Sequence, residues 1–167
     1  NASTTATVGE WVVDASVRRS SSPGYRENGA SDSDIYSAGL FWGNGNWSQQ
    51  VRVVNDSQYS QWPGALTFDQ FAQNPRQTDG ANSFGKTEET RFISNTQWLF
   101  GKLQAQLDFG ARHRRTETEI WGSPWGSTVN NQQISPKLSY DFDLGGANKW
   151  VQTVGFDYQH WKRGMPA

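Results

Sequence analysis

The 167-residue sequence contains no cysteine, only one methionine and only two histidines. Without cysteine the chain has no disulfide, no thiolate nucleophile and no cysteine-ligated zinc site. Long hydrophobic runs are also missing, because no apolar stretch approaches the ~20 residues of a membrane-spanning helix. Neither sign of charge dominates, since 15 basic residues face 16 acidic ones. We therefore expect no nucleic-acid partner.

Aliphatic residues are scarce, whereas aromatic residues are plentiful. Hydrophobic residues make up 34% of the chain and aromatic residues 14%, with nine Trp and nine Phe. So few hydrophobic residues are too few to form the core of a soluble domain of this length. Disorder does not explain the composition either, because disordered chains are poor in aromatic residues. A transmembrane β-barrel reconciles the two facts, because it needs apolar side chains on one face of each strand and aromatic residues at the membrane boundaries.

Alternation with a period of two residues is the strongest pattern in the sequence. In Lys102–Arg114, Leu103, Ala105, Leu107, Phe109 and Ala111 fall on one parity, and Gln and charged residues fall mostly on the other. A strand separates such sets onto opposite faces, whereas a helix mixes them. The same pattern predicts seven strands in all: Val8–Arg18, Asp34–Trp42, Trp47–Asn55, Glu89–Trp98, Lys102–Arg114, Gln133–Phe142 and Lys149–His160.

The connections between these strands alternate in length. Short turns rich in Gly and Asn are expected at Gly43–Asn46, Leu99–Lys102 and Asp143–Asn148, and long loops at Arg19–Ser33, Asp56–Glu88 and Trp121–Asn131. Short periplasmic turns and long extracellular loops are typical of outer-membrane barrels. Within the longest loop, the residues after Thr67 favour a short helix with Thr67 as its N-cap. This loop is the predicted site of ligand recognition.

Aromatic residues flank the short turns. On the apolar parity they predict one girdle at the periplasmic membrane boundary, with Tyr36, Phe92 and Tyr158 near the other boundary. The girdle residues are Trp11, Trp42, Trp47, Trp98, Phe100, Phe142 and Trp150. Outer-membrane lipid is therefore an expected partner.

The opposite parity carries charges of both signs, which suits a barrel lumen. It includes Arg52, Arg91, Arg112, Arg114, Lys137, Glu10, Asp14, Glu89, Asp108, Asp141 and Asp157. Near the long loops, cations and aromatic rings favour binding of an anionic aromatic ligand through charge-assisted hydrogen bonds and stacking. The candidate ligand-binding residues are Tyr59, Trp62, Arg76, Arg112, Arg114, Trp121 and Trp125.

No enzymatic or metal site is predicted. His113 and His160 fall on the apolar parity, so neither can act as the base between Ser139 and Asp157 on the other face. The acidic residues at 116–119 and the pair Asp32 and Asp34 lack the spacing of a calcium-binding loop. We expect no catalytic residues and no cofactor.

Seven strands cannot close a barrel by the even-strand rule, so residues 1–167 are expected to form one partial barrel domain. Several segments resemble TonB-dependent outer-membrane receptors. They are Asp14–Arg19 followed by Gly24-Tyr25-Arg26-Glu27-Asn28, Pro63–Thr67 with Asn74-Pro75-Arg76-Gln77, and Ile134–Phe142 followed by Val154–Tyr158.

The resemblance implies a bacterial outer-membrane barrel of 22 strands, plugged by an N-terminal domain that is not in this sequence. Such receptors import a scarce small-molecule nutrient, such as a ferric siderophore or related cofactor, with the TonB system as partner. Two alternatives stay open. One is a soluble Trp-rich β-sandwich that binds carbohydrate, and the other is a small closed outer-membrane barrel with an eighth strand.

Overall fold

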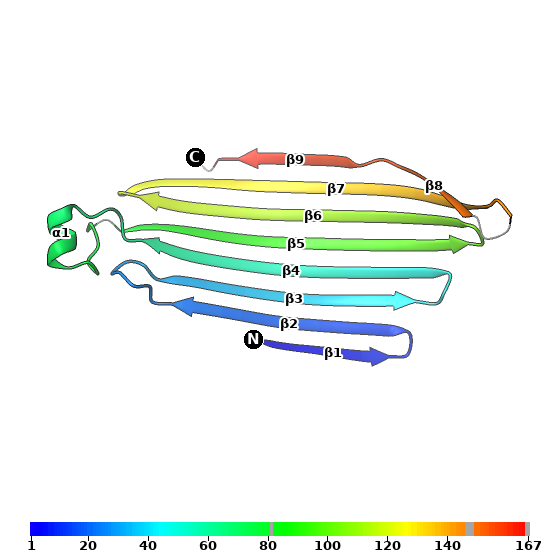
Figure 1. Ribbon diagram of the computed structural model, residues 1–167, viewed down its shortest axis with the longest axis horizontal. Helices are drawn as coiled ribbons and strands as arrows, with labels where there is room; N and C mark the ends of the chain where they lie inside the picture. The colour runs from blue at the N-terminus through cyan, green and yellow to red at the C-terminus, as the bar shows by residue number, and fades with distance from the viewer. Residues whose placement is uncertain (81, 146–148, 166–167) are drawn as a thin grey trace.

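The computed structural model describes residues 1–80, 82–145 and 149–165 as one antiparallel sheet in which the chain runs up and down. In Figure 1 the strands lie side by side in chain order, with one short helix beyond one end of the sheet. This confirms the predicted all-β, antiparallel meander. The elements are β1 (Ala2–Val8), β2 (Trp11–Ser22), β3 (Ser31–Gly43), β4 (Trp47–Trp62), α1 (Phe68–Gln73), β5 (Ser83–Phe100), β6 (Leu103–Ile120), β7 (Ser123–Asp143), β8 (Lys149–Gly155) and β9 (Tyr158–Gly164).

The prediction of seven strands missed the first one. Residues Ala2–Val8 form β1, which pairs with β2 along its whole length. The two strands are joined by a turn at Gly9, with φ of 61°, and Glu10. Glu10 therefore lies in a turn and not on a strand face as predicted. The alternation of β1 is weak because Ser and Thr occupy both parities.

At the other edge, the predicted strand Lys149–His160 is divided into β8 and β9 opposite Pro136. Both segments pair with β7 in one register, Gly155 with Lys137 and Tyr158 with Ile134. The Phe156 backbone N–H donates to the Pro136 carbonyl at 3.3 Å, but Pro136 has no N–H with which to return the bond. The segments share one position, so the sheet has eight strand positions. Within the described ranges its two edges, β1 and β8–β9, do not pair, and the sheet is open.

The short turns at one end agree with the prediction where they are described. Residues 44–46 join β3 to β4, and residues 101–102 join β5 to β6. The predicted turn Asp143–Asn148 falls partly on residues 146–148, which lie outside the described residues. The turns at 44–46 and 101–102 lie at the same end of the sheet in Figure 1, opposite α1.

Two of the predicted long loops are shorter than expected, and the prediction of the third is wrong. The loop Arg19–Ser33 reduces to residues 23–30 and Asp56–Glu88 to residues 63–82, because the strands extend into polar sequence. The predicted loop Trp121–Asn131 is a two-residue turn, with φ of 50° at Trp121 and 76° at Gly122. Positive φ at both central residues is the geometry of a tight hairpin. Connection lengths therefore do not alternate strictly between short and long.

The predicted short helix is confirmed as α1. The Thr67 hydroxyl accepts a hydrogen bond from the Gln70 backbone N–H at 3.3 Å, and the Gln70 side-chain oxygen accepts one from the Thr67 N–H at 2.9 Å. This reciprocal pair is a capping box, which satisfies backbone donors at the helix start. In the described part of the chain, no helix has the length and apolar character needed to cross a membrane.

The register places the two predicted residue sets on opposite faces of the whole sheet. One cross-strand row contains Asp14, Gly39, Arg52, Ile93, Gly110, Gln133 and Gln159, and we call its side the polar face. The neighbouring row contains Ala15, Ala38, Val53, Phe92 and Ala111, and we call that side the apolar face. No apolar side chain of the described residues is buried, because the sheet is a single layer.

The apolar face is apolar over only part of its height. Next to the short turns, β6 presents Leu103, Ala105, Leu107, Phe109 and Ala111, and then the same face continues with His113, Arg115, Glu117 and Glu119. The equivalent segments are 11–17 in β2, 36–42 in β3, 47–53 in β4, 92–100 in β5, 134–142 in β7 and 150–158 across β8 and β9. In β4 and β5 the apolar side chains are interrupted by Gln49, Ser94 and Thr96, which hydrogen-bond one another. We call these segments together the apolar band.

Candidate functional site

The predicted ligand-binding residues are divided among four places. Arg112 and Arg114 lie on the polar face of β6, and Trp62 and Trp125 lie on the same face of β4 and β7. Tyr59 lies on the apolar face, above the apolar band. Trp121 lies in the β6–β7 turn and Arg76 in the loop between α1 and β5. The structure therefore does not bring the seven residues together as one site.

On the polar face, each of the two Trp residues has a local partner. The ring of Trp62 covers Gly85, such that a Cβ added at Gly85 would lie 2.9 Å from the Trp62 ring. The guanidinium of Arg163 lies 5.7 Å from the ring centre of Trp125, within the range of a cation–π interaction. These aromatic surfaces lie towards the loop end of the sheet, where the strands extend beyond the apolar band.

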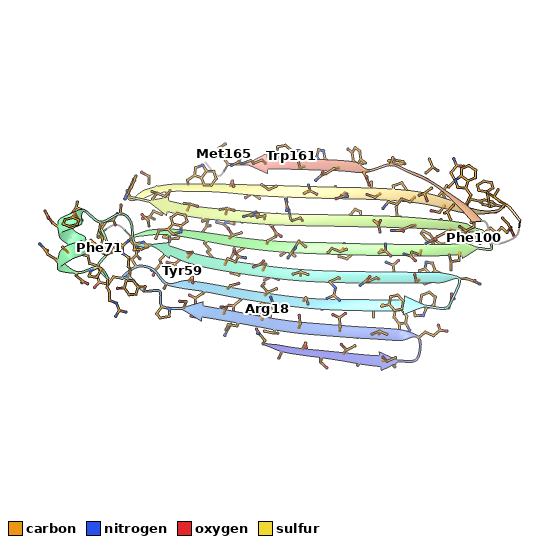
Figure 2. All side chains as sticks on the ribbon, viewed as in Figure 1. Arg18, Tyr59, Phe71, Phe100, Trp161 and Met165 are labelled. Atoms are coloured by element: carbon orange, nitrogen blue, oxygen red, sulfur yellow. The ribbon has the colours of Figure 1, made fainter. Side chains whose placement is uncertain are left out.

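Tyr59 and Trp121 have different surroundings. The Tyr59 ring lies 5.7 Å from Phe84 on the neighbouring strand. Trp121 is 75% exposed, and its backbone N–H donates to the Ser83 hydroxyl at 3.1 Å. The exposed Trp121 ring is thus free to stack on a ligand, whereas the Tyr59 ring packs against the sheet. Figure 2 places Tyr59 on the sheet near the loop end and Phe71 on α1 beyond it.

The loop residue Arg76 is engaged within the chain. Its Nε donates to the Tyr25 carbonyl at 3.1 Å, and its guanidinium lies 5.2 Å from the centre of the Tyr25 ring. The Arg76 carbonyl in turn accepts the Glu27 backbone N–H at 2.7 Å. Arg76 therefore connects loop 63–82 to loop 23–30, and a ligand would have to compete with Tyr25 for its side chain.

Arg26, which sequence reasoning did not select as functional, fixes the same two loops from the other side. Its Nη1 donates to the Gly64 carbonyl at 2.7 Å, its Nε to the Gln77 carbonyl at 3.0 Å and its Nη2 to the Pro63 carbonyl at 3.2 Å. A planar guanidinium suits such multiple acceptors. We call loops 23–30 and 63–82 with Arg26 and Arg76 the loop pair. For Arg26 itself, the sequence signal is that it lies in a segment that resembles a receptor family.

The charged residues of the polar face form cross-strand networks. Arg52 Nη2 lies 2.8 Å from Asp14 Oδ2, and the pair bridges Gly39, where a Cβ would lie 2.2 Å from that oxygen. Nearer the short turns, the Asp108 carboxylate accepts hydrogen bonds from the side-chain amides of Asn95 and, at 2.8 Å, Gln106. Lys137 Nζ lies 3.6 Å from Asp108 Oδ2. Glycine at position 39 thus makes room for an ion pair between strands that are not adjacent.

All seven predicted girdle residues lie on the apolar face beside the short turns. Trp11 is the cross-strand partner of Trp42, Trp47 of Trp98 and Phe142 of Trp150. Ring centres lie 5.8 Å apart for Trp11 and Trp42 and 5.2 Å apart for Phe142 and Trp150. Such pairs stabilise a sheet by about 0.5–1.5 kcal/mol beyond the area that they bury.

No family model matches this sequence, and none of the curated proteins searched is similar to it.

The histidines are arranged as their parity predicts. His113 and His160 lie on the apolar-face side of β6 and β9, and His113 Nδ1 lies 2.7 Å from Asn130 Oδ1. Ser139 lies on the polar face of β7, opposite to the side of His113 and His160, and Asp157 lies between β8 and β9, outside both strands. Across the described residues there is no cluster of three or more His, Asp or Glu side chains able to hold a metal ion.

Proposed function

We propose that the chain is a wall section of a bacterial outer-membrane β-barrel, in a TonB-dependent receptor that binds and imports a scarce nutrient such as a ferric siderophore or related cofactor. The apolar band carries the membrane part of this proposal. The polar face, the loop pair and the resemblance of the sequence carry the receptor part.

The height of the apolar band matches a bilayer core. In β6 it runs from Leu103 to Ala111, which at ~3.4 Å per residue is about 27 Å along the strand. A tilt of ~35–45° lowers this to a height of about 20 Å, close to the ~25 Å band of outer-membrane barrels. Aromatic girdle residues border the band on the short-turn side, and charged residues on the other. A face that simply meets water needs neither boundary.

The opposite face suits a lumen. Its ion pairs and amide networks leave a mixed-charge surface that can hydrogen-bond water, a plug domain or a polar solute. Beyond the band, the strands continue with mostly polar side chains on both faces, apart from a few aromatic rings, and the loop pair lies past their ends. In the proposed receptor, nutrient recognition occurs at this end, where Trp62, Trp121, Trp125, Arg112 and Arg114 are available.

Both alternatives fit the structure less well. A carbohydrate-binding sandwich buries apolar residues between two sheets, but the described residues form one layer with an open apolar face. A small closed barrel needs eight strands, and the sheet does have eight strand positions. Closure also needs its two edges to pair, and the described β1 does not pair with β8 or β9. We therefore favour a larger barrel.

Single cysteines test the membrane part, because the chain has none of its own. Spin labels at Ala105→Cys and Gln106→Cys in the full-length protein should differ in vesicles. The label at 105 should be relaxed by lipid-soluble oxygen, and the label at 106 by a water-soluble nickel chelate. Equal accessibility at both positions would contradict a membrane wall.

The receptor part has a separate test. Cells that lack the full-length protein should lose uptake of one member of a panel of ferric siderophores, haem and cobalamin, and loss of TonB should have the same effect. Unchanged uptake across the panel would reject the receptor while leaving the barrel in place.

A further inference from the structure

The polar face contains a hollow around Gly110 that none of the contacts described above occupies. No atom lies within 4 Å of the point where a Cβ at Gly110 would be. The hollow has a volume of about 240 Å³, and Arg91, Arg112, Asn131, Gln133 and Gln159 lie around it. We call it the glycine hollow. Its floor is the backbone of β6, and its walls come from β5, β7 and β9.

The two arginines of the hollow are direct cross-strand partners. Like charges in that position destabilise a sheet, so their pairing needs compensation. Arg91 Nε lies 3.1 Å from Glu89 Oε1, on the side away from Gly110. Neither Arg112 nor Arg114 forms an ion pair with any described residue. Arg112 therefore brings a positive charge to the hollow without an ion pair of its own.

The nearby carboxylates do not neutralise that charge. Asp56 is the cross-strand partner of Glu89 on β4, and the Gln58 amide donates to Asp56 at 3.2 Å. Glu89 is also the direct cross-strand partner of Arg114, whereas the cross-strand row of Arg112 contains no acidic residue. On the other side of the hollow, Asp108 lies on the same face of β6, where it is engaged by Asn95, Gln106 and Lys137.

The remaining polar side chains of the hollow are amides. Asn131 is the cross-strand partner of Arg112, and Gln133 is the partner of both Gly110 and Gln159. Each side-chain amide carries two N–H donors, of which Gln133 directs one to the Ser135 hydroxyl at 3.4 Å, and no carboxylate lines the hollow. Two guanidiniums with amide donors at the sides form a receptor for carboxylate or phosphate oxygens, which accept charge-assisted bonds in a bidentate manner.

We infer that the glycine hollow is an anion-binding site that takes a carboxylate or phosphate group between Arg91 and Arg112. Glycine at position 110 provides the space, and the cross-strand arginine pair provides the charge. The occupant comes either from a free small anion or from a carboxylate side chain of a polypeptide segment that the barrel encloses. The inference needs only the folded sheet and not nutrient uptake.

Arginine modification by phenylglyoxal, followed residue by residue with mass spectrometry, tests the site in the full-length protein. Inorganic phosphate or citrate, at about ten times the concentration that half-fills the site, should slow modification of Arg112 by about tenfold, because only the empty site reacts. Arg18 is the internal control, since it lies on the same face of β2, away from the hollow (Figure 2). Its rate should not change with either anion.

The Arg112→Lys variant distinguishes the two sources. A carbodiimide couples its amine to any carboxylate that it contacts, so a cross-link to another segment identifies a polypeptide occupant. Protection by added anion without a cross-link identifies a free one. Absence of both protection and cross-link overturns the inference, whatever the outcome of the uptake experiments.

Gly110→Val provides the matched variant, because a side chain there enters open space and favours the strand. It should remove the protection or the cross-link while the protein still folds and inserts. Protection that persists with the hollow filled also overturns the inference.

Discussion

The half of the sheet beside the short turns, here the lower half, and the half towards the loops, here the upper half, are built from the same strands in the same register. They differ in the chemistry of their side chains. Beside the short turns, one face is apolar and ringed with aromatic side chains, while the other is polar. Towards the loops, both faces are mostly polar, and ion pairs such as Arg19–Asp34, at 2.6 Å, occur on the face that is apolar beside the short turns. The backbone ladder passes between the halves without interruption in β2 to β6.

This difference shows that strand length and apolar height are set independently. β6 has 18 residues, whereas ~9–11 are enough to cross a membrane with tilt. Ladder hydrogen bonds and polar cross-strand pairs are sufficient to extend the strands, and the side chains alone decide which part contacts an apolar phase. The loop pair is thereby held well beyond the apolar band.

Removal of the loop should have the largest effect on the upper half. The Asp79 N–H donates to the Pro63 carbonyl at 3.0 Å, so the ends of segment 64–79 lie close together. A Gly-Ser dipeptide in place of 64–79 should leave the barrel inserted but reduce nutrient uptake by about tenfold or more, because long functional loops carry recognition. Uptake and surface level are measured in parallel. Normal uptake at normal surface level would move recognition away from this loop.

An arginine introduced on the apolar face within the apolar band should lower the stability of the barrel. Leu107→Arg places a charge in the middle of the apolar band and should cost about 2–4 kcal/mol of barrel stability. Gln106→Arg, one residue away on the polar face, should cost much less. Arg115 lies on the same face of the same strand beyond the apolar band, so the cost of Leu107→Arg comes from the position within the band and not from the face alone. Stability is measured by urea unfolding in lipid vesicles, and equal penalties at 106 and 107 would reverse the assignment of faces.

Loss of Arg26 should loosen the loops without affecting the band. Arg26→Ala removes donors to three backbone carbonyls, and hydrogen bonds to a charged group contribute about 1.5–3 kcal/mol each at most. Amide exchange and protease cleavage in 63–80 should rise, while exchange in 103–111 stays constant. Arg18→Ala is the control, since it removes the same charge outside the loop pair. Unchanged loop protection would mean that Tyr25 and Arg76 hold the loops without Arg26.

The smallest effect is expected at the glycines of the polar face. Gly39→Ala places a methyl group against Asp14 and should displace the Asp14–Arg52 pair, at a cost of about 0.2–1 kcal/mol for a part-exposed ion pair. Gly110→Ala lies in the same cross-strand row and enters open space, so it should be neutral or slightly stabilising. The comparison is made by urea unfolding, and equal effects at the two positions would show that the ion pair contributes nothing.

Sequence reasoning located the strands best where the apolar alternation is strong. The faces of β6 and all girdle residues follow from parity, because period two is a direct consequence of strand geometry. Polar strand extensions were missed for the converse reason: residues 123–131 in β7 have no apolar alternation, and their pairing depends on the ladder with β6. The tight turn at Trp121 was hidden because a bulky residue rarely adopts positive φ.

The candidate site was predictable only in part. Arg112 and Arg114 were placed on the correct face, since parity alone fixes that. The engagement of Arg76 by Tyr25, the three acceptors of Arg26 and the space above Gly110 depend on contacts between segments about 20–50 residues apart, and these arise only from register and loop conformation. No local pattern encodes them.

The unbroken register has a consequence for how such a chain can change over time. Because each ladder runs without a bulge, one inserted or deleted residue within a strand would exchange the two faces of everything beyond it up to the next turn. Lengths can therefore change safely only in steps of two, or at the loops and turns where a strand begins and ends. Insertions and deletions of a single residue should therefore be found in the loops and turns of related chains and not within their strands.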